Sequence, residues 1–236
     1  MAVSLERTWF GQVPTLVARP TGARAPLPTA LWFHGLSADK DVHRHELERL
    51  AASGFLAIGV DCAGHGERRL PDFDRQFSHP PAPTDRLFGV LVAQTAAEVP
   101  QIIDTLIQSG LTDPNGIAAA GVSMGACIVY RAVATERRIR AAAALLGSPE
   151  WAYPNGPHER ADSFFPTALL SITAECDDIV APAAARKLHD ALISHYASQP
   201  ERLSYRQIAA APHFLNPEDW FSAVGDAIAW LRRFVR

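Results

Sequence analysis

The sequence of residues 121–125, Gly-Val-Ser-Met-Gly, has the G-x-S-x-G pattern that can expose a serine hydroxyl as a nucleophile. A short apolar run, residues 117–120, precedes the motif, and a stretch with helical patterning, Met124 to about Thr135, follows it. In that context the serine lies in a tight strand-to-helix turn, at the positive end of the following helix. We therefore predict that Ser123 is a nucleophile.

A serine hydroxyl needs a general base and an orienting carboxylate to attack near neutral pH. The last part of the chain contains both, in the order Ser, Asp, His. Asp177 and Asp178 follow one apolar run, and His213 follows the next one. Because the carboxyl ends of parallel strands meet at one edge of a sheet, these side chains are expected to lie beside Ser123. We predict a catalytic triad in which His213 is the base.

Short apolar runs alternate with amphipathic stretches, which is typical of βαβ units around a parallel sheet. Strands are predicted at residues 3–10, 15–19, 29–33, 55–60, 117–120, 141–146, 167–173 and 203–208. Helices are predicted at residues 42–52, 85–109, 124–135, 183–195 and 217–234. We expect Asp41 to cap the first helix and Pro100 to kink or restart the second. The sequence contains no repeat or dividing linker, so residues 1–236 are predicted to form a single α/β domain.

Two long segments, residues 67–83 and 148–166, are rich in proline and aromatic residues and lack either periodicity. Long irregular loops in a domain of this type often serve as lids or pocket walls. Because the chain has no room for a separate cap domain, we expect these two loops to form the walls of the pocket. The aromatic residues of the second loop are Trp151, Tyr153, Phe164 and Phe165, and they could equally pack onto the core.

The composition excludes several classes of protein. The chain has 236 residues, of which 48% are hydrophobic and 20% charged, with a net charge of −3. Neither sign forms a long run, so we expect no contact with nucleic acid or an anionic membrane surface. No apolar run reaches the roughly 18 residues of a membrane span. Charged residues near the N-terminus stand where a signal peptide would be apolar, so the expected compartment is the cytoplasm.

The sequence also contains no pattern for a metal or cofactor site. Its three cysteines are scattered and form no Cys-x-x-Cys pair. His43 and His45 would point apart on a helix, and there is no H-E-x-x-H motif. A glycine-rich phosphate loop is also missing. We therefore predict neither metal nor cofactor, and the oligomeric state stays open.

Taken together, these motifs resemble the α/β-hydrolases, and among them the dienelactone hydrolases and the prolyl-oligopeptidase-type esterases. The resemblance extends over almost the whole chain. It rests on His34-Gly35, the sequence Asp-Cys-Ala-Gly-His-Gly-Glu-Arg at residues 61–68, the serine turn, the aspartate segment and His213. It implies an α/β-hydrolase fold with a mostly parallel central sheet flanked by helices.

One departure from the family pattern narrows the implied chemistry. Dienelactone hydrolases carry a cysteine at the position of Ser123, and haloalkane dehalogenases carry an aspartate there. The resemblance therefore implies an ordinary serine carboxylesterase that acts on small or medium-sized carboxylic esters through an acyl-enzyme. A thioesterase or peptidase on the same fold, or a catalytically silent binding protein of this shape, stays as the alternative.

The resemblance leaves two candidates for the acid. In similar hydrolases the acid is followed by two variable residues, then valine, then proline. Counted from Asp177, Val180 keeps its place and the proline is displaced to Pro182. Counted from Asp178, the proline falls at the expected distance, but Ala181 replaces the valine. We favour Asp177 and keep Asp178 as the alternative.

An oxyanion hole needs two backbone N–H groups that point at the developing charge. We expect one from Met124, which follows the nucleophile. The other is expected from Leu36, in the loop after His34-Gly35. His34 is then predicted to brace that loop. Residues 64–68 are expected to brace the neighbouring loop, with substrate contact as their alternative role.

Overall fold

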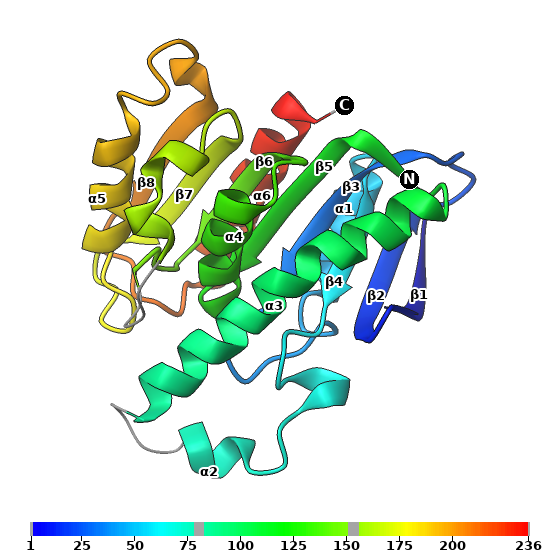
Figure 1. Cartoon of the computed structure of the whole chain (residues 1–236), viewed down its shortest axis with the longest axis horizontal. Helices are drawn as coiled ribbons and strands as arrows, with labels where there is room; N and C mark the ends of the chain where they lie inside the picture. Colours follow the sequence, from blue (N-terminus) through cyan, green and yellow to red (C-terminus); the bar gives the residue numbers. More distant parts are fainter. Residues whose placement is uncertain (1, 78–82, 151–155, 236) are drawn as a thin grey trace.

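The structure, a computed structural model, describes residues 2–77, 83–150 and 156–235, and eight strands among them form one sheet (Figure 1). Across the sheet their order is β1-β2-β4-β3-β5-β6-β7-β8. The strands are β1 (Val3–Phe10), β2 (Val13–Pro20), β3 (Leu27–Phe33), β4 (Leu56–Val60), β5 (Thr112–Val122), β6 (Ile139–Leu145), β7 (Ala168–Ala174) and β8 (Leu203–Ile208). Only β2 is antiparallel to both of its neighbours, so the predicted mostly parallel sheet is confirmed.

Helices cover both faces of the sheet (Figure 1). One face packs against α3 (Pro83–Gln108), α4 (Met124–Thr135) and α5 (Ala183–Leu192). The other face packs against α1 (Arg44–Ala52) and α6 (Pro217–Phe234). A short helix, α2 (Phe73–Phe77), precedes α3 in the chain. Each face therefore has its own apolar core, as expected for an α/β sheet.

The two central strands β5 and β6 are rich in alanine, and this decides how closely the helices approach. Residues 118–120 of β5 and 141–144 of β6 are all alanine and all buried. Alternate residues face opposite cores, so small side chains line the middle of both faces. Helix α4 consequently packs close to the sheet, and its buried Gly125 and Ala126 lie near the backbone of neighbouring loops.

The direction in which the chain winds changes between β3 and β5. Helix α1, which follows β3, lies on one face, whereas α4, which follows β5, lies on the other. The loops that leave these neighbouring strands therefore diverge, and a crevice opens at their carboxyl ends. Ser123 follows β5 and Leu36 follows β3, so the topology places both beside this crevice.

Most predicted elements match the structure to within a few residues, and α4, β8 and α6 begin and end where the pattern predicts. The largest difference is β5, which begins at Thr112 rather than Ile117. Residues 113–116, Asp-Pro-Asn-Gly, lie inside this strand and coincide with an irregularity in its pairing with β3. Pro100 lies inside α3, which continues from Pro83 to Gln108, so the second predicted helix does not restart there. Burial of its apolar face offsets the lost hydrogen bond.

The prediction that Asp41 caps the first helix is wrong. Helix α1 begins after His43, whose side chain makes no capping hydrogen bond. Asp39 instead accepts hydrogen bonds from the backbone N–H groups of Asp41 and Val42, at 2.9 and 3.2 Å. The Asp41 carboxylate lies 2.7 Å from the guanidinium of Arg7 on β1. Asp41 and Val42, which the sequence places at the start of the helix, therefore belong to a turn that precedes it.

Helix α3 qualifies the expectation that no segment could span a membrane. Residues Arg86–Gln108 are long and apolar enough to do so by length and composition. In the structure, Val92, Val99 and Ile103 of this helix are buried in the core on one face of the sheet. We therefore interpret its apolar character as that of a core helix.

Two histidines are buried in the neutral form. His34 accepts a hydrogen bond from the N–H of Cys62, and burial lowers its pKa to about 3. His189 Nε2 lies 2.8 Å from the hydroxyl of Ser171, which also contacts the hydroxyl of Tyr130. Burial lowers the pKa of His189 to about 4. In the unfolded chain both would take up a proton below about pH 6.5. Acid therefore favours unfolding, because the unfolded state binds more protons.

For each of these two histidines, we expect the free energy of unfolding to fall by about 2 kcal/mol when the pH is lowered from 7.5 to 5. The effect begins as the pH falls through the ordinary histidine pKa and stops growing only near the lowered folded-state pKa. Urea denaturation of the wild type and of His189→Gln at both pH values measures it. The glutamine variant should lose about 2 kcal/mol less than the wild type on acidification. Equal losses in the two proteins would contradict this prediction.

Candidate active site

Ser123 lies in a tight turn between β5 and α4 with a backbone conformation that few residues adopt. Its φ is +54° and its ψ −116°, and its N–H donates to the carbonyl of Leu145 at 2.8 Å. Neither of the two motif glycines leaves room for a side chain. A Cβ on Gly121 would lie 2.5 Å from the carbonyl oxygen of Gly125, and one on Gly125 would lie 2.1 Å from that of Phe33. Strained backbone of this kind is often found at functional sites.

The structure brings Ser123, Asp177 and His213 together in one hydrogen-bonded chain. The Ser123 hydroxyl lies 3.1 Å from His213 Nε2, and His213 Nδ1 lies 2.7 Å from Asp177 Oδ2. Both the imidazole and the carboxylate are buried, with exposed side-chain fractions of 7% and 1%. Asp178 is exposed to solvent. Of the two aspartates, Asp177 is therefore the one that contacts the histidine.

Two backbone groups hold Asp177 in this position. Its Oδ1 accepts hydrogen bonds from the N–H groups of Ile179 at 3.0 Å and Val180 at 2.7 Å. The second oxygen, Oδ2, is left to face His213. A carboxylate can only accept, so the proton of the neutral imidazole belongs on Nδ1 and Nε2 can accept from the serine. The arrangement can therefore remove the proton of Ser123 as its oxygen attacks.

The groups expected to form the oxyanion hole lie at the same place. Leu36, Ser123 and Met124 all line one cavity. Met124 is the first residue of α4, so its N–H has no partner within the helix. A carbonyl oxygen of a substrate held at Ser123 would therefore be close to the positive end of α4. The oxyanion role of Leu36 and Met124 stays a prediction.

The cavity above Ser123 has a volume of about 1170 Å³ and is lined mainly by apolar side chains. Its wall comes from the loop from β3 to α1, the first turns of α3, the segment after β6, the loops that carry Asp177 and His213, and the first turns of α4, α5 and α6. The lining residues outside the triad and the oxyanion candidates include Val42, His43, Phe88, Leu146, Ile179, Val180, Phe214, Leu215 and Trp220.

Of the two predicted pocket walls, the described residues confirm only the start of the second. No described residue of 67–83 lines this cavity, and of the described part of 148–166 only Ser148 and Glu150 do. Phe164 is completely buried in the core, and Phe165 packs edge-on against Tyr196 at 5.4 Å. For these two aromatics the core-packing alternative therefore holds. Trp151 and Tyr153 lie outside the described residues.

Sequence reasoning missed His43 and Trp220, which line the cavity although they lie 177 residues apart. The sequence presents His43 only as a weak candidate metal ligand. No local pattern marks it, because its position in the cavity depends on how α1 and α6 pack beside each other. Among the described residues, no group of three or more histidine, cysteine, aspartate or glutamate side chains could hold a metal ion.

His34 joins the two loops that leave β3 and β4. Its Nδ1 lies 2.8 Å from the carbonyl oxygen of Gly35, and its Nε2 accepts from the N–H of Cys62 at 3.0 Å. The ring of His65 packs against that of His34 at 5.2 Å. Because burial lowers the pKa of His34 to about 3, this imidazole stays neutral and cannot serve as a proton donor near neutral pH. Its contacts are those of a residue that braces the loop.

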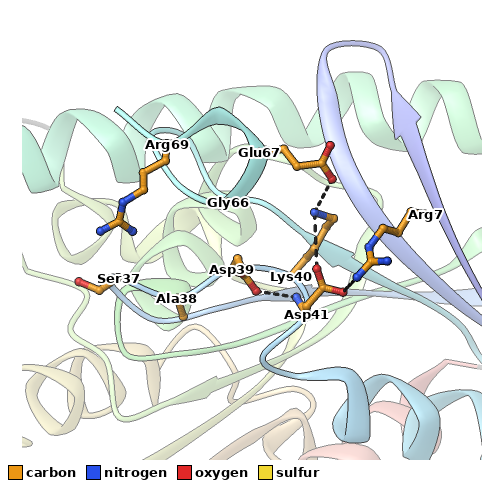
Figure 2. A pocket seen from close by; sticks show the side chains of 9 residues that line it. All are labelled: Arg7, Ser37, Ala38, Asp39, Lys40, Asp41, Gly66, Glu67 and Arg69. Carbon is orange, nitrogen blue, oxygen red and sulfur yellow. Dashed lines mark hydrogen bonds and ion pairs between the residues drawn. The ribbon is translucent and has the colours of Figure 1, made fainter. Parts of the chain in front are cut away.

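Residues 61–68 form a second brace, centred on Asp61. The buried carboxylate of Asp61 accepts from the backbone N–H and the ammonium of Lys40, both at 2.9 Å, and from the N–H of Glu67. Gly66 has a φ of +57°, and a Cβ there would overlap the Asp61 carboxylate. Residues 64–68 do not line the large cavity. Gly66 and Glu67 border a separate polar hollow of about 310 Å³ (Figure 2).

Comparisons with known proteins agree with this architecture. A model of the alpha/beta hydrolase family matches residues 30–236. Esterase YjfP of Escherichia coli (strain K12) is 25% identical over 186 residues, which cover 77% of this chain and 69% of that esterase. The crystal structure of TT1662 from Thermus thermophilus matches with a TM-score of 0.80 and 24% identity, over 99% of this chain and 98% of the other.

A further solved structure is more distant in sequence. The dienelactone hydrolase-like promiscuous phosphotriesterase P91 from metagenomic libraries matches with a TM-score of 0.74 and 14% identity. The match covers 100% of this chain and 99% of P91. At such identities the structural likeness shows the fold, and the predicted resemblance is confirmed at that level.

Proposed function

The chain belongs to the alpha/beta hydrolase family, and from that premise we propose that it is a serine esterase that hydrolyses carboxylic esters of small or medium size. The observation that carries the proposal is the hydrogen-bonded chain from Ser123 through His213 to Asp177 at the base of a largely apolar cavity. A cavity with few polar groups at the reacting centre suits a neutral ester with an apolar acyl or alcohol part.

The proposed reaction follows the order of the contacts. The Ser123 oxygen attacks the ester carbonyl carbon while His213 Nε2 accepts the serine proton. The N–H groups of Leu36 and Met124 stabilise the negative oxygen of the tetrahedral intermediate. His213 then gives its proton to the departing alcohol, which leaves an acyl group on Ser123. A water molecule, activated in the same way, releases the acid, and Asp177 stabilises the imidazolium in both halves.

A fluorophosphonate probe tests whether the serine is activated, because it reacts with catalytic serines and not with unactivated hydroxyl groups. We expect the folded protein to be labelled at Ser123 and the heat-unfolded protein to remain unlabelled. Peptide mapping by mass spectrometry identifies the site. A folded protein that takes up no probe would indicate a silent binding protein and would contradict the proposal.

The substrate class is tested with p-nitrophenyl esters of increasing acyl length, assayed beside an acyl thioester and a peptide anilide. We expect the highest kcat/KM for an ester, with the thioester and the anilide well below it. A higher kcat/KM for the thioester or the anilide would instead assign the protein to the thioesterases or the peptidases.

A further inference from the structure

The cavity contains a second histidine, His43, whose position is fixed by its neighbours. It stands at the N-terminus of α1, and its side chain is only 13% exposed. Its ring contacts two indole rings, with centroid distances of 5.5 Å to Trp32 and 5.7 Å to Trp220. Packing against both indoles holds the imidazole in one orientation at the cavity wall.

Glu46, one turn further along α1, determines the orientation of the proton on this ring. Its Oε2 lies 3.4 Å from His43 Nδ1, and its Oε1 accepts from the indole N–H of Trp220 at 2.8 Å. Burial alone would raise the pKa of Glu46, but these two hydrogen bonds outweigh it and lower that pKa. The carboxylate is therefore ionised near neutral pH and only accepts hydrogen bonds, so Nδ1 of His43 carries the proton.

The remaining nitrogen, Nε2, is then a hydrogen-bond acceptor. His43 lines the cavity and Glu46 does not. With Nδ1 turned to Glu46, Nε2 is the polar atom of the ring that is left for a ligand. Within the described part of the chain Nε2 has no hydrogen-bond partner. The adjoining wall is apolar, formed by Val42, Leu215 and Trp220. An acceptor placed on an apolar wall distinguishes molecules that carry a donor from those that do not.

We propose that His43 is a specificity-determining residue whose Nε2 accepts a hydrogen bond from a hydroxyl group of the substrate. The protein would then prefer esters that carry such a hydroxyl over analogues in which a methyl group replaces it. The apolar surroundings favour a neutral donor, because an ammonium group would lose more hydration on entering. This inference rests on the proposed esterase activity, since it concerns the selection of substrates by the same cavity.

The arrangement also predicts a variant in which His43 donates a hydrogen bond to the cavity instead of accepting one. In Glu46→Gln the Trp220 N–H still requires an acceptor, so the amide oxygen stays there and the amide nitrogen faces His43. Because that nitrogen donates, Nδ1 must accept and the ring proton moves to Nε2. His43 would then offer a donor to the cavity, which can bind a ketone oxygen, whereas the wild-type Nε2 acceptor cannot.

The test compares kcat/KM for matched pairs of esters at pH 8. On the acyl side these are p-nitrophenyl 3-hydroxybutyrate against 3-methylbutyrate, and 6-hydroxyhexanoate against heptanoate. On the alcohol side they are 4-hydroxybutyl against pentyl butyrate, followed by titration of the released acid. In the wild type we expect a preference of about 3- to 10-fold for the hydroxylated ester in at least one pair, the size of one hydrogen bond.

Two variants and one control separate the role of the hydrogen bond from that of packing. His43→Phe keeps a ring against the two tryptophans and should bring the ratio for the preferred pair to about 1. Glu46→Gln should favour the p-nitrophenyl 6-oxoheptanoate ester over heptanoate, a preference that the wild type should lack. His45→Phe, at an 84% exposed side chain of the same helix, should keep the wild-type ratio.

The outcomes separate the two proposals. Ratios near 1 for every pair in the wild type, or the same ratio in the wild type and both variants, would overturn the role of His43 while the esterase activity stands. A wild type that hydrolyses no ester of the panel would contradict the proposed function, and this inference with it. Because each variant is judged by a ratio between two substrates, a change in its overall rate does not affect the conclusion.

Discussion

Replacing Ser123 with alanine is expected to lower kcat for ester hydrolysis by about 10⁶-fold, the loss found when a triad serine is removed elsewhere. The reason is geometric. The Ser123 oxygen is the group that His213 Nε2 contacts, at 3.1 Å, so without it the base has no nucleophile to activate. The two motif glycines and the turn remain, and alanine at position 123 adds no new atom to the site.

The measurement is kcat for the preferred p-nitrophenyl ester, with circular dichroism and thermal unfolding to show that the variant is folded. Ser194→Ala, at an exposed serine beyond α5, serves as a matched control and should retain wild-type activity. If Ser123→Ala kept more than about a tenth of the activity, the chemistry would have to lie at another residue.

Asp177→Asn is the second large effect, and we expect a loss of about 10⁴-fold in kcat. The N–H groups of Ile179 and Val180 require an acceptor, so the amide oxygen of the asparagine stays with them. The amide nitrogen then faces His213 Nδ1 and donates to it. The ring proton moves to Nε2, which can no longer accept the proton of the serine.

Asp178→Asn is the matched control for this change, because it makes the same substitution at the adjacent exposed aspartate. It should cost about tenfold or less. Steady-state kinetics on the same ester compare the two variants, and urea denaturation shows whether either change affects folding. If Asp178→Asn were the more damaging variant, the role of the acid would belong to Asp178.

The fold was predictable because its signals are local. Buried strands such as residues 203–208 and the closing amphipathic helix 217–234 appear as short apolar runs and as a helical period, and both begin and end where predicted. The serine turn could also be predicted from the sequence, because only glycine fits at positions 121 and 125 and the motif shows glycine at both. The predicted cap at Asp41 failed because Asp39 forms a turn over Asp41 and Val42, so the helix begins only after His43.

The walls of the cavity were not predictable from the same kind of signal. Aromatic residues in an irregular loop look alike whether they line a pocket or pack inward, and Phe164 packs inward. Conversely, His43 and Trp220 follow unremarkable helical patterns, yet their side chains line the cavity. The packing of neighbouring elements decides which face of a helix or strand lines a pocket. The hydrophobic periodicity of the sequence does not indicate that face.

By itself, the sequence determined the strands, the helices and the turn that exposes Ser123, because these depend on residues within a few positions of one another. The tertiary structure decided which side chains meet. His213 contacts Asp177 across 36 residues and Ser123 across 90, and Trp220 reaches Glu46 across 174. The two adjacent aspartates 177 and 178 have the same chemistry, and only the path of the loop after β7 brings one of them to His213. Contacts over such separations arise from the packing of the whole sheet and its helices, and therefore only the folded chain specifies them.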